Sequence, residues 1–257
     1  MPDIQQRAAA FDDIDVARCY AHRPPYAPAL YEFLLGLIAR KQCLVDLGCG
    51  PGKIAAALAK DFAQVIAVDP AIAMIETAKA TNPQPNIQWL HMSAEEAALP
   101  EHIDLVTAGT SIHWIKHEVL FPKLAERSKL VAIITGDAPP SPPWLAGESD
   151  FLTRWLARLH GRTYDRPAFV AEGRTYEPWL DIAGRREFTF TFQQSIADYI
   201  ACQHSRASWP RSRMSADLVR EFDRELETVL TPYAHDGMLS FELTSELAWG
   251  APRKTAR

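Results

Sequence analysis

The chain has 257 residues, of which 47% are hydrophobic and 23% charged, a composition typical of a folded globular protein rather than a disordered or fibrous one. Its formal net charge of −5 provides no general attraction to nucleic acid or to an anionic membrane. This charge leads us to expect small-molecule partners. Four dispersed cysteines are too few for a disulfide framework, so we expect a reducing, cytoplasmic location.

The first ten residues carry Asp3, Gln5 and Arg7 before any apolar run, so we expect no secretory signal. No stretch of the sequence reaches the roughly 18 apolar residues that a membrane-spanning helix requires. We therefore expect neither a membrane nor a nucleic-acid partner.

Residues 41–137 alternate apolar runs of strand length with amphipathic stretches of helix length, which is typical of βαβ units and a parallel sheet. The predicted strands are 43–47, 65–68, 87–92, 103–108 and 130–135. The apolar spacing predicts helices over 51–62 and 71–80 between the first three strands.

Beyond residue 137 the pattern changes, because four prolines within 139–143 exclude a helix interior or a central strand. An apolar stripe over 151–159 then predicts a helix, and further helices are predicted near 196–204 and 216–230. Period-two alternation over 188–192 and 239–249 predicts two strands. We expect these late strands to complete the early sheet.

The residues from Val45 to Gly52, with the sequence VDLGCGPG, run from a predicted strand through three glycines into a predicted helix. Glycine permits positive φ angles and lets a ligand lie against the main chain, while the helix start offers free N–H groups. Lys53 and Ile54 exclude a P-loop ending, and Lys53 replaces the third glycine of a dinucleotide fingerprint. A tight turn without a ligand is the alternative to a nucleoside site.

Asp69 favours the nucleoside site over the ligand-free turn. It ends the second predicted strand, about twenty residues past the first glycine, where an acidic side chain accepts both hydroxyls of a ribose. Charge-assisted hydrogen bonds of this kind contribute on the order of 1.5–3 kcal/mol each.

Together, Val45–Gly52, Val68-Asp69-Pro70 with Met74, and Ser93-Ala94-Glu95-Glu96 resemble the motifs of class I S-adenosylmethionine-dependent methyltransferases. Within that family the sequence is similar to the methyltransferase type 11 group, which includes trans-aconitate methyltransferase, over roughly residues 18–137. Upstream, Tyr20-Ala21-His22-Arg23-Pro24-Pro25-Tyr26 resembles the family's N-terminal cover, with a solvated loop as the alternative. The resemblance implies S-adenosylmethionine as the cofactor, bound by Tyr20, Arg23, Asp46, Gly48, Cys49, Gly50, Gly52, Asp69, Pro70, Met74, Ser93, Ala94, Glu95, Thr110 and His113.

The expected fold class is α/β, a Rossmann-like, doubly wound, seven-stranded and mostly parallel sheet with an antiparallel C-terminal strand and a helical insertion that forms a lid. Residues 1–40 are expected to form an N-terminal helical cover and 41–137 the cofactor-binding core. Residues 138–185 are expected to be a substrate-cover insertion, and 186–257 to complete the sheet.

The acceptor is expected beyond the fourth and fifth strands, because ligands of open α/β sheets bind at the carboxyl ends of the strands. His113-Trp114 resembles a His-Trp pair of the family, although Ile115-Lys116 here replaces the aromatic and Asp that often follow it. Asp137, at the end of the fifth strand, is the acid best placed to act in its stead as a catalytic residue that orients an N–H of the substrate or accepts its proton. The alternative is that Asp137 caps a turn. His113 is either a general base or a hydrogen-bonded residue that shapes the cofactor site.

A metal site is not expected. His113 and His117 have i,i+4 spacing, but the sequence offers neither a third ligand nearby nor an acidic HExxH centre.

Aromatic residues are expected to complete the acceptor wall, with ordinary core packing as the alternative. The substrate-contacting candidates are Trp114, Asp137, Trp144, Tyr176 and Trp209. Three arginines cluster near Trp209 in the sequence: Arg206, Arg211 and Arg213. They either bind a carboxylate of the substrate or belong to a solvated basic loop.

The predicted function is methyl transfer from S-adenosylmethionine to the nitrogen or oxygen of a small metabolite that is planar and heterocyclic or carries a carboxylate. Positioning for in-line displacement, rather than strong base catalysis, is expected to supply the acceleration. The alternative is a non-catalytic nucleoside-binding regulator on the same fold. We expect a monomer or a homodimer.

Overall fold

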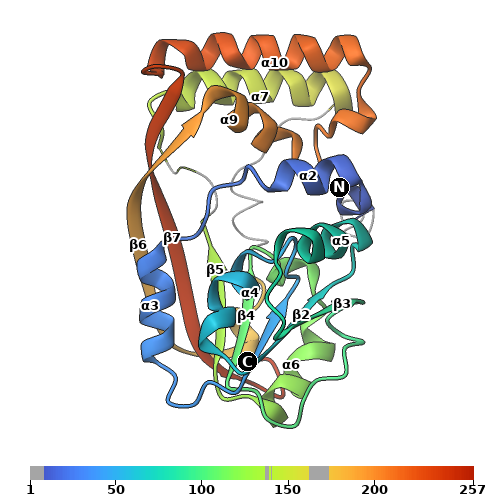
Figure 1. The fold of residues 1–257 in the computed structure, drawn as a ribbon, viewed down its shortest axis with the longest axis vertical. Helices are drawn as coiled ribbons and strands as arrows, with labels where there is room; N and C mark the ends of the chain where they lie inside the picture. Colours follow the sequence, from blue (N-terminus) through green and yellow to red (C-terminus); the bar gives the residue numbers. More distant parts are fainter. Residues whose placement is uncertain (1–8, 137–138, 140, 162–173) are drawn as a thin grey trace.

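The computed structural model describes residues 9–136, 139, 141–161 and 174–257. Seven strands form one sheet in the order β3-β2-β1-β4-β5-β7-β6 (Figure 1). Their bounds are β1 Cys43–Leu47, β2 Gln64–Asp69, β3 Ile87–His91, β4 Leu105–Gly109, β5 Val131–Thr135, β6 Leu180–Ser195 and β7 Met238–Pro252. The first five are parallel, and β7 is antiparallel to both of its neighbours. This confirms the predicted fold class.

The sheet is covered on both faces, which explains why the central strands lack an alternating pattern. All five residues of β1 are buried, as expected for a parallel strand with helices on either side. Helices α3 (Pro28–Gly36), α4 (Lys53–Leu58) and α5 (Ile72–Thr81) contribute to the core on one face. Helix α6 (His117–Arg127) packs on the other face.

Two elements differ from their predicted bounds for identifiable reasons. Helix α4 begins after Gly52, whose φ of +91° is not helical, and its last turn continues as a 3-10 helix over Ala59–Asp61. Strand β6 is longer than its alternating aromatic segment, because it pairs with β7 from Leu180 to Ser195. The pairing partner, rather than the local pattern, determines the length of β6.

A helical layer, which we call the cap, lies beyond the carboxyl edge of the parallel strands (Figure 1). It consists of α7 (Leu145–His160), α9 (Ile196–His204) and α10 (Ala216–Leu230). The outer halves of β6 and β7 pack into the same core as these helices. The cap therefore combines the segment predicted as a substrate cover with residues of the segment predicted to complete the sheet.

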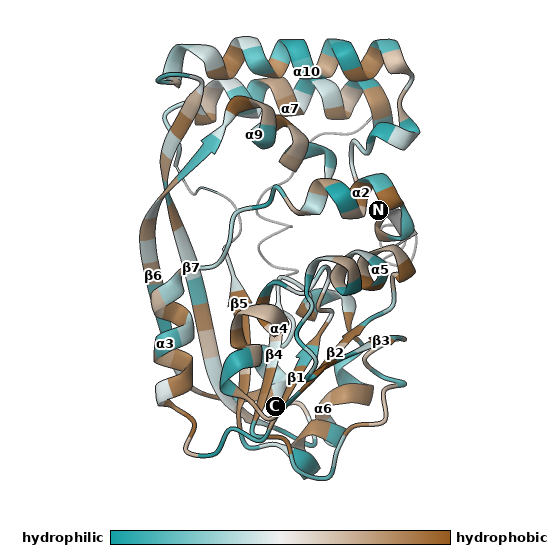
Figure 2. Ribbon diagram, in the orientation of Figure 1, coloured by the Kyte–Doolittle hydropathy of each residue, from teal (hydrophilic) through white to brown (hydrophobic). Residues whose placement is uncertain are grey.

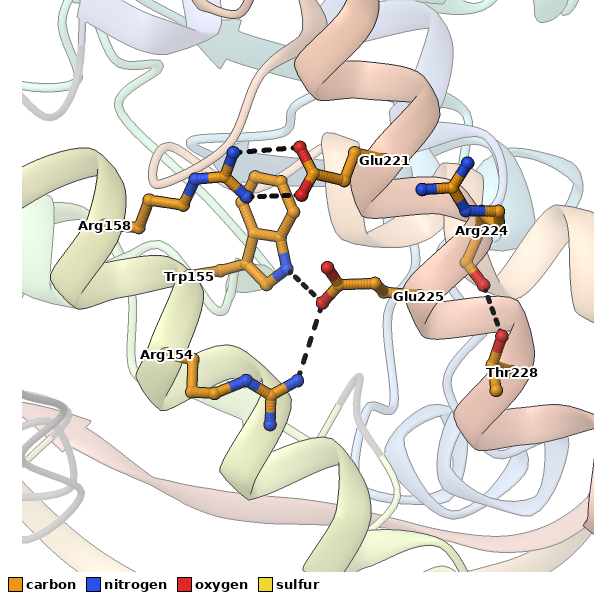
Figure 3. Close-up of polar contacts among 7 residues, drawn as sticks. All are labelled: Arg154, Trp155, Arg158, Glu221, Arg224, Glu225 and Thr228. Atoms are coloured by element: carbon orange, nitrogen blue, oxygen red, sulfur yellow. Dashed lines mark hydrogen bonds and ion pairs between the residues drawn. The ribbon is translucent and has the colours of Figure 1, made fainter.

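Polar contacts align α7 with α10 (Figure 3). The guanidinium of Arg158 donates two hydrogen bonds of 2.8 Å to the carboxylate of Glu221. The indole of Trp155 donates to Glu225 at 3.1 Å. Helix α10 carries both apolar and polar residues along its length (Figure 2). Its buried residues, Phe222, Leu226 and Leu230, are four positions apart and form one face against the cap core.

The N-terminal helix α2 (Ile14–Tyr20) lies between the sheet layer and the cap, against α5 and α9 (Figure 1). Asp13 caps it by accepting the N–H of Asp15 at 2.9 Å. Among the helices of the described residues, none combines the length and apolar character needed to cross a bilayer.

Candidate active site

The glycine turn after β1 adopts a backbone that few side chains tolerate. Gly48, Gly50 and Gly52 all have positive φ, at +63°, +54° and +91°. A Cβ on Gly48 would lie 2.5 Å from the Cβ of Ser111, whereas one on Gly50 would meet only the Tyr20 ring, at 3.9 Å. Gly48 is therefore required for packing, and Gly50 leaves the main chain open toward Tyr20.

Asp69, at the end of β2, holds this turn in place. Its carboxylate accepts the N–H of Gly50 at 2.8 Å and that of Ala71 at 2.9 Å. Burial raises the pKa of Asp69 to about 6, against the lowering effect of these two hydrogen bonds. Two carboxylate oxygens have about four acceptor positions, so Asp69 retains acceptor capacity for ligand hydroxyls.

Asp46 supports the same turn from inside the protein. It accepts the hydroxyl of Thr107 on β4 at 2.7 Å and the N–H of Ala55 in α4 at 3.1 Å. Complete burial raises its pKa to about 7. The carboxylate thus ties β1, β4 and α4 together, and the neighbouring Cys49 is buried with them.

Residues 20–26, which we call the strap, pass over the turn. The Tyr20 ring lies next to Gly50, and the Arg23 guanidinium lies 4.0 Å from the centre of that ring. Arg23 also donates to the hydroxyl of Ser205 at the end of α9, at 2.7 Å. The predicted cofactor residues Tyr20 and Arg23 are thus brought to the glycine turn, and they connect it to the cap.

Lys53 is a candidate site residue that the sequence pattern does not reveal. Its ammonium donates to the carbonyl of Arg23 at 2.9 Å and to that of Pro24 at 2.7 Å. It also lies 5.5 Å from the centre of the Tyr20 ring. Lys53 therefore fastens the strap to the start of α4, a contact between residues about thirty positions apart that no local pattern reveals.

A cavity of about 20 Å³ separates the strap from the turn. Its lining includes Tyr20, Tyr26, Gly48, Cys49 and Gly109. This volume holds about one water molecule. The turn and Asp69 fit a nucleoside cofactor, and a cofactor whose amino-acid part lay in this cavity would require the strap to move outward.

The predicted cofactor residues beyond β2 and β3 have packing and capping contacts. Met74 is buried with Val16 and Ala17 of α2. Glu95 accepts the N–H of Lys116 at 2.6 Å, at the start of α6. Of the other predicted cofactor residues in these segments, Pro70 is exposed, Ala94 is buried, and Ser93 donates to Glu96 at 2.8 Å.

The segment after β4 carries Thr110, His113 and Trp114, which were predicted to contact the cofactor or the acceptor. Thr110 has a φ of +52°, and its hydroxyl lies 2.9 Å from that of Tyr26. His113 and Trp114 follow in a short 3-10 helix with their ring centres 4.7 Å apart. His117 has its Nε2 2.9 Å from the Ile112 carbonyl oxygen, and the described residues contain no cluster of three possible metal ligands.

Other predicted acceptor residues are not brought to the glycine turn. Trp144 and Trp209 are buried in the cap core, where the Trp144 indole donates to the Tyr199 hydroxyl at 3.1 Å. Tyr176 is buried in the core on the α6 side and accepts from Arg185 at 3.2 Å. These three rings pack in hydrophobic cores and do not form a wall of the acceptor site. Large aromatic side chains bury much apolar area, which favours such core positions. Asp137 lies outside the described residues.

The sheet order, the single reversed strand and the glycine turn followed by Asp69 define the class I methyltransferase fold. Residues 44–132 match the family model described as a methyltransferase domain. A structure from Anaeromyxobacter dehalogenans, described as a type II methyltransferase, superposes with a TM-score of 0.66 at 21% identity, covering 91% of this chain and 99% of that one.

Two trans-aconitate 2-methyltransferases are also similar. The Azoarcus enzyme is 26% identical over 147 residues, covering 56% of this chain and 49% of that one. The Enterobacter enzyme is 34% identical over 100 residues, covering 37% and 38%. The chain thus matches less than half the length of these curated relatives. The domain match over residues 44–132 and the fold agree with the predicted resemblance to class I S-adenosylmethionine-dependent methyltransferases, whose cofactor is S-adenosylmethionine.

Proposed function

We propose that this protein transfers the methyl group of S-adenosylmethionine to a small acceptor that carries a carboxylate. The observation that carries the proposal is the glycine turn, with its backbone open at Gly50, Asp69 beneath it and the strap above it. The turn would hold the amino-acid part of the cofactor, and Asp69 would accept the ribose hydroxyls.

The carboxylate class is supported by Arg206, which follows the strap-binding Ser205. Its Nε donates to Gln203 at 3.0 Å, and Gln203 in turn donates to the buried Glu148 at 3.0 Å. A guanidinium oriented in this way suits bidentate binding of a carboxylate. The similarity to trans-aconitate 2-methyltransferases, whose named acceptor is a carboxylic acid, points to the same class.

The mechanism requires the chain mainly to position the acceptor. Bound S-adenosylmethionine supplies a methyl group on a positively charged sulfur, which is already a good leaving group. A carboxylate acceptor is ionised near neutral pH, so neither His113 nor Asp137 needs to remove a proton. Holding the acceptor oxygen in line with the methyl group is worth roughly 7–11 kcal/mol of the barrier.

Calorimetry with S-adenosylmethionine and S-adenosylhomocysteine tests the cofactor site. Methyl transfer from labelled cofactor is then measured on two panels, one of small di- and tricarboxylates and one of uncharged planar heterocycles. We expect binding of both cofactor forms and labelling in the carboxylate panel. Absence of cofactor binding would overturn the proposal, and labelling of heterocycles alone would overturn the carboxylate as acceptor class. Cofactor binding without any methyl transfer would favour the alternative, a non-catalytic nucleoside-binding regulator.

Gly50→Arg is the matched variant for this test. A side chain at φ +54° is strained and enters the space beside Tyr20. We expect this variant to lose measurable cofactor binding. Gly36→Arg is the control, because a Cβ there meets nothing within 4 Å.

A further inference from the structure

The end of β4 contains a backbone conformation that its residue type does not favour. Thr110 has a φ of +52°, and β-branched residues seldom adopt the left-handed region. The other non-glycine residue with positive φ in the described part of the chain is Asp236, which precedes Gly237 in the turn into β7, where Asp is well tolerated. Thr110 lies instead at a candidate active site, where strained backbone is often functional.

Two contacts hold Thr110 in this conformation. Its N–H donates to the carbonyl of Ile134 at 2.8 Å, which extends the pairing of β4 with β5. Its hydroxyl lies 2.9 Å from the hydroxyl of Tyr26, the last residue of the strap. The Tyr26 ring is buried, with 5% of its surface exposed. The side-chain contact thus joins the strap to the end of β4.

Tyr26 is fitted closely to that strand end. A Cβ on Gly109 would lie 3.0 Å from the Tyr26 hydroxyl oxygen and 2.5 Å from the Ile54 side chain. The next residue along the chain, Ala27, donates its N–H to the Ser245 hydroxyl at 2.9 Å in the protein interior. Tyr26 is therefore the anchored end of the strap, unlike Tyr20, which covers the glycine turn.

The conformation of Thr110 sets the course of the segment that follows. Ser111 donates to the Leu47 carbonyl at 2.6 Å, next to the glycine turn. The chain then enters the short 3-10 helix with His113 and Trp114. Tyr26 and Gly109 also line the same small cavity as Gly48. The Tyr26–Thr110 contact consequently fixes the β4 edge and residues 111–114 relative to the cofactor site.

We propose that Tyr26 is a positioning residue for methyl transfer, whose hydroxyl holds Thr110 in its left-handed conformation and thereby sets the β4 edge against the methyl end of the cofactor. The inference rests on the proposed function and deepens it. A purely structural role would lower stability without changing how the site distinguishes a cofactor with a methyl group from one without it.

The test compares Tyr26→Phe, Thr110→Val, Thr110→Gly and the double variant Tyr26→Phe/Thr110→Gly. Phe removes only the hydroxyl, Val keeps the β-branch without it, and Gly adopts positive φ without support. The probes are S-adenosylmethionine and S-adenosylhomocysteine, which differ at the sulfur by the methyl group and its charge. Their two Kd values are measured by calorimetry, and amide exchange over residues 110–115 is followed by mass spectrometry.

For Tyr26→Phe and Thr110→Val we expect S-adenosylmethionine to lose roughly two- to fivefold more affinity than S-adenosylhomocysteine, the size of a weak contact at the methyl end. We expect faster amide exchange over 110–115 in both variants. Adding Thr110→Gly to Tyr26→Phe should restore the Kd ratio to that of Thr110→Gly alone.

An unchanged Kd ratio in folded Tyr26→Phe, or a double variant no better than Tyr26→Phe, would overturn the inference while leaving the proposed function intact. If the unmodified protein binds neither compound, the proposed function fails and the inference fails with it. The two failures are therefore distinguishable. A fall in melting temperature with no change in the Kd ratio counts against positioning.

Discussion

At the scale of single residues, the most informative group is Asp69, because one carboxylate supports the glycine turn and is also the proposed acceptor for the ribose of the cofactor. It accepts two backbone N–H groups and is 8% exposed. Burial raises its pKa to about 6, and burial likewise raises the pKa of nearby Asp46 to about 7. Both groups therefore change charge close to neutral pH.

Opposite pH trends for binding and stability follow from these pKa values. Affinity for S-adenosylhomocysteine should fall as the pH drops below about 6, because protonation of Asp69 removes a charged acceptor. The folded-state pKa values lie above the unfolded value of about 4. The ligand-free folded protein therefore binds these protons more tightly, and its free energy of unfolding should rise as the pH falls from about 7 toward 5.

Calorimetric binding and thermal unfolding between about pH 5 and 8 measure the two trends. Asp69→Asn is the matched variant. It should bind S-adenosylhomocysteine roughly 10- to 100-fold more weakly, from the loss of one charge-assisted acceptor, and it should lack the change in affinity near pH 6. An equally steep pH dependence in the variant would show that another group controls binding.

At the scale of elements, the strap covers the glycine turn and is held at two places. One is buried in the core, and the other is held by a lysine side chain. Tyr26 and Ala27 anchor it to the core. Lys53 fastens it to α4 through the carbonyls of Arg23 and Pro24. Because the cavity beneath it is about 20 Å³, a cofactor bound at the glycine turn as proposed would require the end fastened by Lys53 to open.

Removing the Lys53 ammonium should loosen the strap. Because the strap must open for the cofactor to bind, we expect Lys53→Met to strengthen S-adenosylhomocysteine binding by roughly two- to tenfold, the range for one net hydrogen bond, and to speed amide exchange over residues 20–26. Lys60→Met is the control, since Lys60 is exposed at the end of the same helical segment. Equal behaviour of the two variants would contradict the fastening role of Lys53.

The elements also show what the sequence can predict. Apolar periodicity is local, so the parallel strands were predicted to within about two residues, and the motif around Val45–Gly52 indicated both the turn and its cofactor. The joining of α7, α9 and α10 into one cap depends on contacts across a long stretch of chain. The positive φ of Thr110 was likewise hidden, because threonine disfavours that conformation.

At the scale of the whole molecule, the sheet layer and the cap share structural elements. Strands β6 and β7 run through both, with Phe188 in the core beside α3 and Phe241 in the cap core. Helix α2 packs on α5 and on α9, and Arg23 reaches Ser205. The cap is therefore built into the same folding unit as the sheet.

We accordingly expect one cooperative unfolding transition for sheet and cap. Trp155, 2% exposed between α7 and α10, is the test residue. Trp155→Ala should lower the free energy of unfolding by about 3–5 kcal/mol and shift the whole transition. Arg158→Ala, a change on the same helix as Trp155 that removes the surface ion pair with Glu221, should lower the free energy of unfolding by much less.

Scanning calorimetry with and without S-adenosylhomocysteine completes this test. Ligand at a hundredfold excess over Kd should stabilise that single transition by about 2.7 kcal/mol, in the unmodified protein and in Arg158→Ala alike. The proposed ligand site is at the glycine turn, so a shift of the cap together with the sheet requires the shared strands to couple them. Two resolved transitions, with Trp155→Ala moving one and ligand moving the other, would instead mean that the cap folds separately.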